Sequence, residues 1–212
     1  MFDTALFDLD GTLTDPFEGI TNSIVYALKK FGIEVSDKRN LIDFIGPPLA
    51  ESFRSVYGFG EEDAQKAVAY YREYFSEKGI FENRVYTGVE DMLKNLKLRN
   101  VKIILATSKP QPFAERILAH FNLESYFDFV AGATLDSRRS QKAEVISYAL
   151  EGGNANVQNS VMVGDRKHDV LGAKAHGLKS IGVLYGYGGL EELLKSGAAF
   201  LADTPSDILK FI

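Results

Sequence analysis

Thr4-Ala5-Leu6-Phe7-Asp8-Leu9-Asp10-Gly11-Thr12 is the stretch that decides the fold, because an apolar run ends there at two carboxylates and a glycine. Such a run predicts a short buried strand of a parallel sheet, whose carboxyl end is where ligands bind. One carboxylate there can attack phosphorus and the second can transfer protons. Gly11 would let backbone N–H groups approach a phosphoryl oxygen. The stretch therefore predicts phosphoryl transfer through an aspartyl phosphate.

Two other structures are compatible with acids and a glycine after a strand. They can form only a turn, or cap the next helix. A calcium-binding EF-hand loop is the second alternative, and it needs a glycine at position 6 and a glutamate at position 12. Counted from Asp8, position 4 is Gly11 and position 12 is Gly19. The calcium loop is therefore excluded.

The composition is that of a globular protein with one core and a smaller appendage: 212 residues, of which 45% are hydrophobic. A net charge of -5 argues against nucleic acid polymers and anionic membranes as partners. No apolar run reaches the roughly 18 residues of a membrane span, and the first strand leaves no room for a signal peptide. The absence of cysteine excludes disulfides and thiolate metal sites. We expect a cytoplasmic protein.

The spacing of apolar residues along the chain changes near Asp15 and again near Arg84. Between residues 17 and 79 apolar residues recur at helical spacing, interrupted by Gly46-Pro47-Pro48, which would form a rigid loop. We expect a helical cap domain over residues 15–83, inserted into an α/β core of residues 1–14 and 84–212.

Beyond Arg84, short apolar runs alternate with amphipathic segments. The runs predict strands over residues 101–106, 127–131, 160–163 and 180–183, and the segments predict helices over residues 88–98, 112–121, 140–150 and 167–176. Apolar strands that alternate with helices form a parallel sheet covered on both faces. The predicted fold is a doubly wound, Rossmann-like α/β core with an inserted all-helical cap.

Polar residues follow the predicted strands and should therefore meet at one edge of the sheet. Thr107, Ser108 and Lys109 follow the second strand, and Lys142 lies at the start of a predicted helix. The Thr107 hydroxyl, the Ser108 backbone N–H and the Lys142 ammonium could bind phosphate oxygens. Arg138 and Arg139 compete for the role of Lys142.

Asp165 and Asp169 lie four residues apart where the strand over residues 160–163 gives way to a helix. Four carboxylates in one crevice need a cation, because two charges about 4 Å apart repel by about 4 kcal/mol at an effective dielectric of about 20. Oxygen ligands beside a phosphate favour Mg2+. The predicted metal ligands are Asp8, Asp10, Asp165 and Asp169. The scattered histidines do not suggest a zinc site.

In order and approximate spacing, these residues resemble the four motifs of the haloacid dehalogenase superfamily. The similar residues are Asp8-x-Asp10-Gly11-Thr12, Thr107, Lys142 and Gly164-Asp165-x-x-x-Asp169. The resemblance implies that Asp8 is the nucleophile and Asp10 the acid and base. It also implies phosphate binding by Gly11, Thr107, Ser108 and Lys142, and a mobile cap that excludes water. The acid at Asp10 is typical of the phosphatase branch.

Within this family, Asp15-Pro16-x-x-Gly19-Ile20 and Ile45-Gly46-Pro47-Pro48-Leu49 resemble the phosphoglycolate phosphatase and 5'-nucleotidase-like group. The resemblance implies a small phosphomonoester as substrate. We expect a nucleoside 5'-monophosphate, and phosphoglycolate is the runner-up. Cap residues expected to set specificity are Glu18, Gly46, Arg54 and Lys78.

Three questions stay open in the sequence. A β-phosphoglucomutase-like transfer and a non-enzymatic phosphate sensor are alternatives to hydrolysis. The chain could be a monomer or a homodimer. The run Gly186-Tyr187-Gly188-Gly189 lacks the spacing of a dinucleotide-binding loop and predicts a flexible loop near the site.

Overall fold

A computed structural model describes residues 2–136 and 138–212 and separates the chain into two compact units. One unit comprises Met1–Asp15 and Val85–Ile212, and the other comprises Pro16–Arg84. Each boundary lies one residue after the one expected from the sequence. Two short strands, β2 (Thr14–Asp15) and β3 (Arg84–Val85), pair where the chain passes from one unit to the other.

The larger unit is built on a six-stranded parallel sheet with the order β5-β4-β1-β6-β7-β8. Its strands are β1 (Thr4–Phe7), β4 (Lys102–Pro110), β5 (Phe129–Ala133), β6 (Ser160–Gly164), β7 (Lys179–Val183) and β8 (Phe200–Ala202). The chain builds the sheet outward from β1 on one side, and then returns to the other side at β6. Ligands bind at such a switch in strand order, so the fold itself marks the carboxyl end of β1.

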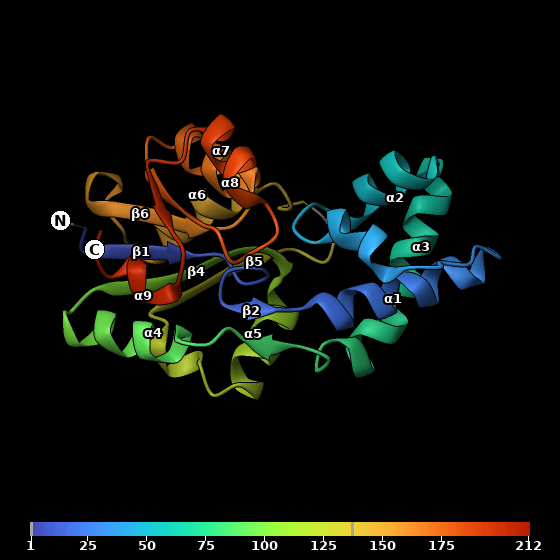
Figure 1. The fold of residues 1–212 in the computed structure, drawn as a ribbon, viewed down its shortest axis with the longest axis horizontal. Coiled ribbons are helices and arrows are strands. Elements are labelled where there is room, and N and C mark those ends of the chain that lie inside the picture. Colours follow the sequence, from blue (N-terminus) through green and yellow to red (C-terminus); the bar gives the residue numbers. More distant parts are fainter. Residues whose placement is uncertain (1, 137) are drawn as a thin grey trace. The chain divides into compact units, whose positions relative to one another are not determined.

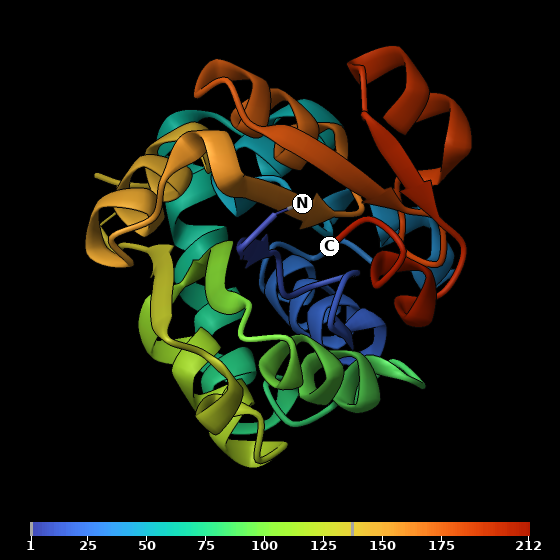
Figure 2. The same ribbon diagram turned by 90° about the vertical axis from the view of Figure 1, so that its left-hand side faces the viewer.

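Helices cover both faces of the sheet, with α6, α7 and α8 on one face and α4, α5 and α9 on the other (Figures 1 and 2). The helices are α4 (Val89–Leu98), α5 (Gln111–His120), α6 (Lys142–Gly152), α7 (Lys167–Ala175), α8 (Gly189–Ser196) and α9 (Pro205–Ile208). Short 3-10 turns precede β5 and β6, over Glu124–Tyr126 and Val157–Asn159. The predicted doubly wound α/β core is confirmed.

The core is made by the apolar strands and the inner faces of these helices. Leu6 of β1, Ile104 of β4 and Met162 of β6 are fully buried with Val145 and Ile146 of α6. Burial on both faces explains why these strands read as continuous apolar runs and not as alternating ones.

The structure corrects some element limits. The strand predicted over residues 127–131 is β5, and it lies two residues later. β4 continues past Ala106 to Pro110, so Thr107 and Ser108 belong to its end. The strand β8 and the helices α8 and α9 were not predicted.

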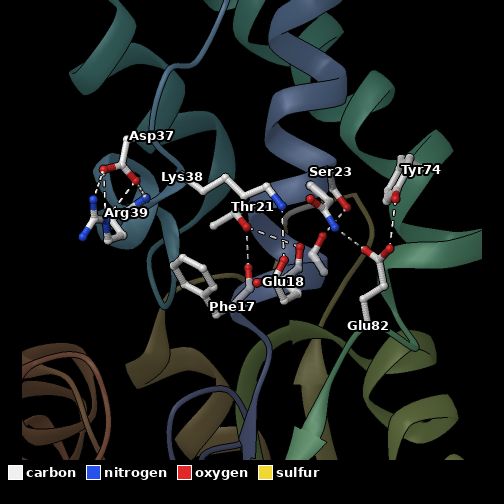
Figure 3. Close-up of polar contacts among 11 residues, drawn as sticks. Phe17, Glu18, Thr21, Ser23, Asp37, Lys38, Arg39, Tyr74 and Glu82 are labelled. Atoms are coloured by element: carbon white, nitrogen blue, oxygen red, sulfur yellow. Dashed lines mark hydrogen bonds and ion pairs between the residues drawn. The ribbon is translucent and has the colours of Figure 1, made fainter.

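The regular structure of the smaller unit is helical, apart from Arg84, which begins β3. It contains α1 (Phe17–Lys30), a 3-10 segment η1 (Lys38–Phe44), α2 (Leu49–Tyr57), α3 (Glu61–Tyr74) and a π-helical turn η2 (Phe75–Gly79). Close packing of α1 on η2 requires Gly19, because a Cβ atom there would lie 1.9 Å from the Gly79 carbonyl oxygen. Asn22 and Tyr74 both donate to Glu82, at 2.8 and 3.0 Å, which ties the two ends of this unit together (Figure 3).

The four residues expected to set specificity lie on different elements of this unit. Glu18 of α1 pairs with Lys38 at 3.1 Å on the surface (Figure 3). Arg54 of α2 pairs with Glu61, also on the surface. Gly46 precedes α2 with a φ of 111°, and Lys78 is exposed on η2. Their role in specificity stays a prediction.

Among the helices of residues 2–136 and 138–212, none is long and apolar enough to span a bilayer.

Candidate active site

The carboxyl ends of three neighbouring strands bring the predicted site residues together. In the sheet register Phe7, the last residue of β1, lies opposite Leu105 of β4 and Val163 of β6, so β6 ends one residue beyond β1 whereas β4 continues to Pro110. The backbone N–H of Asp8 then donates to the Val163 carbonyl at 2.9 Å, which continues the ladder for one more residue. Asp8 is 5% exposed. Its carboxylate therefore lies at the switch point of the sheet, mostly shielded from water.

Lys142 joins two of the predicted acids. It is the first residue of α6 and is 6% exposed, and its Nζ lies 2.7 Å from Asp8 Oδ1 and 2.7 Å from Asp169 Oδ1. The same ammonium donates to the Ala106 carbonyl at 3.1 Å. Gly172 of α7 gives its stem room, since a Cβ there would lie 2.9 Å from Lys142 Cγ. Three oxygen contacts fix the ammonium in place.

The two cations that competed for this role lie elsewhere. Arg138 pairs with Asp136 at 2.6 Å on the exposed surface. Arg139 donates to the Gly132 carbonyl at 3.0 Å, and its guanidinium stacks over the Tyr148 ring at 3.8 Å. Among these three candidates, the structure brings Lys142 to Asp8.

Asp8, Asp165 and Asp169 each present an oxygen atom, and the three atoms lie within 4.8 Å of one another. All three side chains are buried. Oxygen donors at this spacing suit a hard divalent cation such as Mg2+, which takes few protein carboxylates and completes its shell with water and phosphate. Asp10 is not part of this carboxylate trio, and its place among the predicted metal ligands stays a prediction.

Burial and mutual repulsion shift the pKa values of these acids. Burial, together with the neighbouring Asp169 and Asp8, raises the pKa of Asp165 well above its usual value. Burial also raises the pKa of Asp169 to about 6, although Lys142 opposes the shift. For Lys142, burial alone would lower the pKa, but Asp169 and Asp8 outweigh it and raise it. The trio carries more negative charge than Lys142 balances, which is the electrostatic condition for binding a cation.

Asp10 is held in a turn that brings its carboxylate into contact with a second buried lysine. Gly11, with a φ of 83°, closes this turn by donating to the Thr14 carbonyl at 2.7 Å. Asp10 Oδ2 lies 2.6 Å from Lys109 Nζ. Burial raises the pKa of Asp10, and Lys109 partly offsets that shift. The sequence showed Lys109 beside Thr107 and Ser108, but spacing alone could not assign it a partner.

The residues predicted to bind phosphate lie at the end of β4 and the start of α6. Thr107 is 1% exposed, and its hydroxyl accepts the Lys109 N–H at 3.2 Å. Ser108 is half-buried beside it. These two residues and Lys142 surround the carboxyl end of β1, because β4 neighbours β1 and Lys142 reaches Asp8. Their contact with a phosphate stays a prediction.

The glycine-rich run after β7 packs on Asp165 and is not a dinucleotide loop. The Tyr187 N–H donates to Asp165 Oδ2 at 2.8 Å. Both glycines beside Tyr187 leave space that the Asp165 residue fills: a Cβ at Gly186 would lie 2.3 Å from Asp165 Cβ, and one at Gly188 2.2 Å from the Asp165 carbonyl. The Tyr187 hydroxyl also bonds Asp15. The run therefore lies beside the acid cluster, near the site as the sequence predicted, and its flexibility stays a prediction.

We expect Gly186→Ala to disturb the acid cluster. The added methyl would meet Asp165 Cβ and the Gly11 carbonyl, at 2.3 and 2.4 Å, so one of them must move. Overpacking of this kind costs about 1–3 kcal/mol. Chemical denaturation should show that loss, and titration with Mn2+ followed by electron paramagnetic resonance should show at least about tenfold weaker binding.

Gly60→Ala is the matched control, because its methyl meets no atom within 4 Å and its φ is -67°. Unchanged Mn2+ affinity in Gly186→Ala would show that the loop does not position Asp165.

The raised pKa of Asp169 predicts a pH dependence of stability in metal-free protein. An acid whose folded pKa lies above its unfolded value binds more protons when folded, so stability falls as pH rises from about 4 to about 6. Replacing Asp169 by Asn removes this titration. As pH rises over that interval, the unfolding free energy of the wild type should therefore fall by about 2 kcal/mol relative to that of Asp169→Asn. Urea denaturation in a chelator at pH 4.5 and 7 measures it, and a parallel course of the two proteins would contradict it.

Comparison with known proteins extends over nearly the whole chain. A family model described as haloacid dehalogenase-like hydrolase matches residues 5–183. A 5'-nucleotidase of Pseudomonas aeruginosa is 46% identical over 188 residues, which cover 89% of this chain and 85% of that protein. The tyrosine-protein kinase PtkA of Mycobacterium tuberculosis is 41% identical over 183 residues, and the match spans 86% of this chain but only 62% of PtkA. A crystal structure of a predicted phosphatase from Clostridium acetobutylicum superposes with a TM-score of 0.97 at 47% identity, covering 100% of this chain and 98% of the other.

Proposed function

The chain belongs to the haloacid dehalogenase-like hydrolase family, and from that premise we propose that it is a Mg2+-dependent phosphomonoesterase acting on nucleoside 5'-monophosphates. That it is a phosphatase of this family follows from its matches to the family and to phosphatases. The metal and the substrate are the proposed part.

One observation supports the chemistry most strongly. Asp8 lies at the switch point of the sheet, with Lys142 Nζ 2.7 Å from its Oδ1 and with oxygen atoms of Asp165 and Asp169 within 4.8 Å. A carboxylate oxygen, a cation and a set of oxygen ligands are the parts that an in-line attack on a phosphoryl group needs.

In the first half of the proposed reaction, an Asp8 oxygen attacks phosphorus. The bond between phosphorus and the ester oxygen breaks as the bond to Asp8 forms, and Asp10 gives a proton to the departing alkoxide. In the second half, Asp10 takes a proton from a water molecule whose oxygen attacks phosphorus, which releases phosphate and restores the Asp8 carboxylate. The raised pKa of Asp10 suits a group that must give and take a proton.

The other residues would hold the phosphoryl group in place. Lys142 and the polar groups of Gly11, Thr107 and Ser108 would donate to its oxygens. Asp8, Asp165 and Asp169, with the Asp10 carbonyl, would hold Mg2+. When bound, this ion neutralises the acid cluster and stabilises negative charge on the phosphoryl oxygens.

Substrate choice is proposed to depend on the helical unit Pro16–Arg84, acting as a cap. Its support is the likeness to the 5'-nucleotidase of P. aeruginosa, which extends over 89% of this chain. The candidate residues there are Glu18, Gly46, Arg54 and Lys78. A small-molecule partner is expected, and a cytoplasmic location stays a prediction.

The likeness to PtkA supports a second candidate, in which the phosphoryl group passes from Asp8 to a hydroxyl acceptor instead of water. A β-phosphoglucomutase-like reaction belongs to the same class. Such an enzyme would accumulate phosphorylated Asp8 and release phosphate slowly without an acceptor.

Release of inorganic phosphate from a substrate panel tests the proposal. The panel contains nucleoside 5'-monophosphates, phosphoglycolate, sugar phosphates and p-nitrophenyl phosphate, each with Mg2+ and with chelator. We expect Mg2+-dependent release with the highest kcat/KM for a nucleotide. A higher kcat/KM for phosphoglycolate than for any nucleotide would instead support the alternative that the enzyme is a phosphoglycolate phosphatase. No release from any compound by the folded, Mg2+-bound protein would contradict hydrolysis and favour a transferase or a sensor.

A further inference from the structure

The two oxygens of the Asp10 carboxylate lie in different surroundings. Oδ2 contacts Lys109 Nζ at 2.6 Å, with only 12% of the aspartate side chain and 5% of the lysine side chain exposed. Oδ1 is buried and has no hydrogen-bond partner among residues 2–136 and 138–212. A buried acceptor without a partner is costly, and it usually marks a place where a ligand or water donates. The pair thus leaves one oxygen of Asp10 available and fixes the other.

The fold places Lys109 through an irregularity in the sheet. β4 and β5 pair regularly as far as Thr107 and Gly132, and then shift register, so that Pro110 lies opposite Ala133. Within this irregular stretch the Lys109 N–H bonds the Thr107 hydroxyl at 3.2 Å. Irregularities of this type re-aim side chains beside active sites. Lys109 is therefore held by its own backbone near Thr107 while its ammonium reaches Asp10.

The turn that carries Asp10 is restrained as well. A bridge joins Asp10 to Thr14, and the Thr14 N–H donates to the Leu9 carbonyl at 3.0 Å. With the backbone fixed at both residues, the remaining freedom of Asp10 is rotation of its carboxylate. A short charge-assisted hydrogen bond to one oxygen removes that freedom.

We propose that Lys109 is a positioning residue that orients the Asp10 carboxyl group, so that Oδ1 delivers the proton to the leaving oxygen. The inference rests on the proposed phosphatase reaction, in which Asp10 gives this proton as the ester bond breaks. Lys109 contacts neither the phosphorus nor the leaving group in this role. It acts through Asp10 alone.

A lysine that only neutralises a buried acid would have a different signature. Its loss would disturb the site as a whole and slow every substrate alike. Loss of proton delivery instead slows only those substrates whose leaving group needs a proton. The leaving group of an alkyl phosphate is a strongly basic alkoxide, whereas the leaving group of p-nitrophenyl phosphate is the stable p-nitrophenolate anion. The ratio between the two separates the roles.

The experiment measures kcat/KM of Lys109→Met for the best alkyl phosphate of the panel and for p-nitrophenyl phosphate. This quantity reports the steps up to cleavage of the ester and omits the later hydrolysis of the phosphoenzyme. Positioned acid catalysis contributes about 10²-fold or more. We expect kcat/KM to fall by about 10²-fold for the alkyl phosphate and by less than about fivefold for the aryl phosphate.

Lys97→Met is the matched control, since Lys97 also pairs with an aspartate, Asp128, at 3.0 Å but outside the site. It should leave both values within about twofold of wild type. If Lys109→Met does not fold, as judged by circular dichroism, Lys109→Gln takes its place, and the same unequal loss is expected. An equal loss on both substrates, or no loss on the alkyl phosphate, would overturn the role of Lys109.

The activity of the wild type tests the proposed function separately from the role of Lys109. A wild-type enzyme that hydrolyses neither substrate would overturn the phosphatase reaction, and the role of Lys109 with it. A wild type active on both, with equal losses in the variant, would overturn the role of Lys109 alone.

Discussion

Replacement of Asp8 by Asn is expected to lower turnover by about 10³-fold or more on every substrate that the wild type accepts. An amide oxygen is a poor nucleophile, and in the proposed reaction Asp165 and Asp169 bind the metal ion while Asp10 transfers protons, so none of them replaces Asp8. The backbone N–H of residue 8 would still bond Val163, and the amide has the same shape as the acid. Loss of activity should therefore occur in a folded protein.

Steady-state kinetics with the preferred substrate measures this loss, and circular dichroism checks the fold. Wild-type enzyme quenched in acid during turnover should carry a phosphoryl group on the peptide containing Asp8, and the variant should not. Asp3→Asn is a suitable control, because Asp3 is an exposed aspartate at the opposite end of the same strand. Retention of more than about a tenth of the wild-type turnover by Asp8→Asn would contradict a nucleophilic role.

Replacement of Lys142 by Met is expected to impair both turnover and stability. The ammonium lies between Asp8 and Asp169, at 2.7 Å from each, and all three side chains are almost fully buried. Removing one partner of a buried ion pair costs about 3–5 kcal/mol, because the remaining charge stays without compensation. Loss of a positioned donor to the phosphoryl group should reduce kcat by about 10²- to 10³-fold.

Denaturation with urea at pH 7.5 in a chelator should show the loss of stability, and Mg2+ should restore part of it by neutralising the same acids. Arg139→Ala is the comparison that separates Lys142 from its rival, since Arg139 contacts the Gly132 carbonyl and the Tyr148 ring instead of Asp8. A larger loss of kcat in Arg139→Ala than in Lys142→Met would show that the wrong cation has been assigned to the phosphate.

The sequence was a sound guide to the sheet, because apolar runs flanked by glycine and acids leave little choice of structure. β1, β4, β6 and β7 lie within a few residues of their predicted positions. β8 escaped prediction because Phe200–Ala202 is a three-residue edge strand of partly exposed residues, with too little periodic signal. β4 was predicted too short because its last residues are polar, and polar residues after an apolar run resemble a loop.

The sequence also predicted one part of the active site better than the other. It predicted that Asp8, Asp165 and Asp169 lie together, since the carboxyl ends of parallel strands meet at one edge of the sheet. Lysines are harder to assign, because a flexible four-carbon stem reaches many partners. Lys142 contacts an aspartate 134 residues away in the chain, and nothing in the local spacing distinguishes it from Arg139.

The sequence by itself determined the class of fold, the polar residues that follow the strands and the acid cluster that they form. These features depend on short-range patterns and on the geometry of parallel strands. The family resemblance already pointed to Lys142 at the phosphate site, whereas only the tertiary structure decided that its ammonium lies between Asp8 and Asp169 and that Lys109 meets Asp10. The tertiary structure also decided that Gly186 and Tyr187 pack on Asp165. The reason is physical: such contacts depend on side-chain rotamers and on the close approach of distant segments, which the packed core fixes.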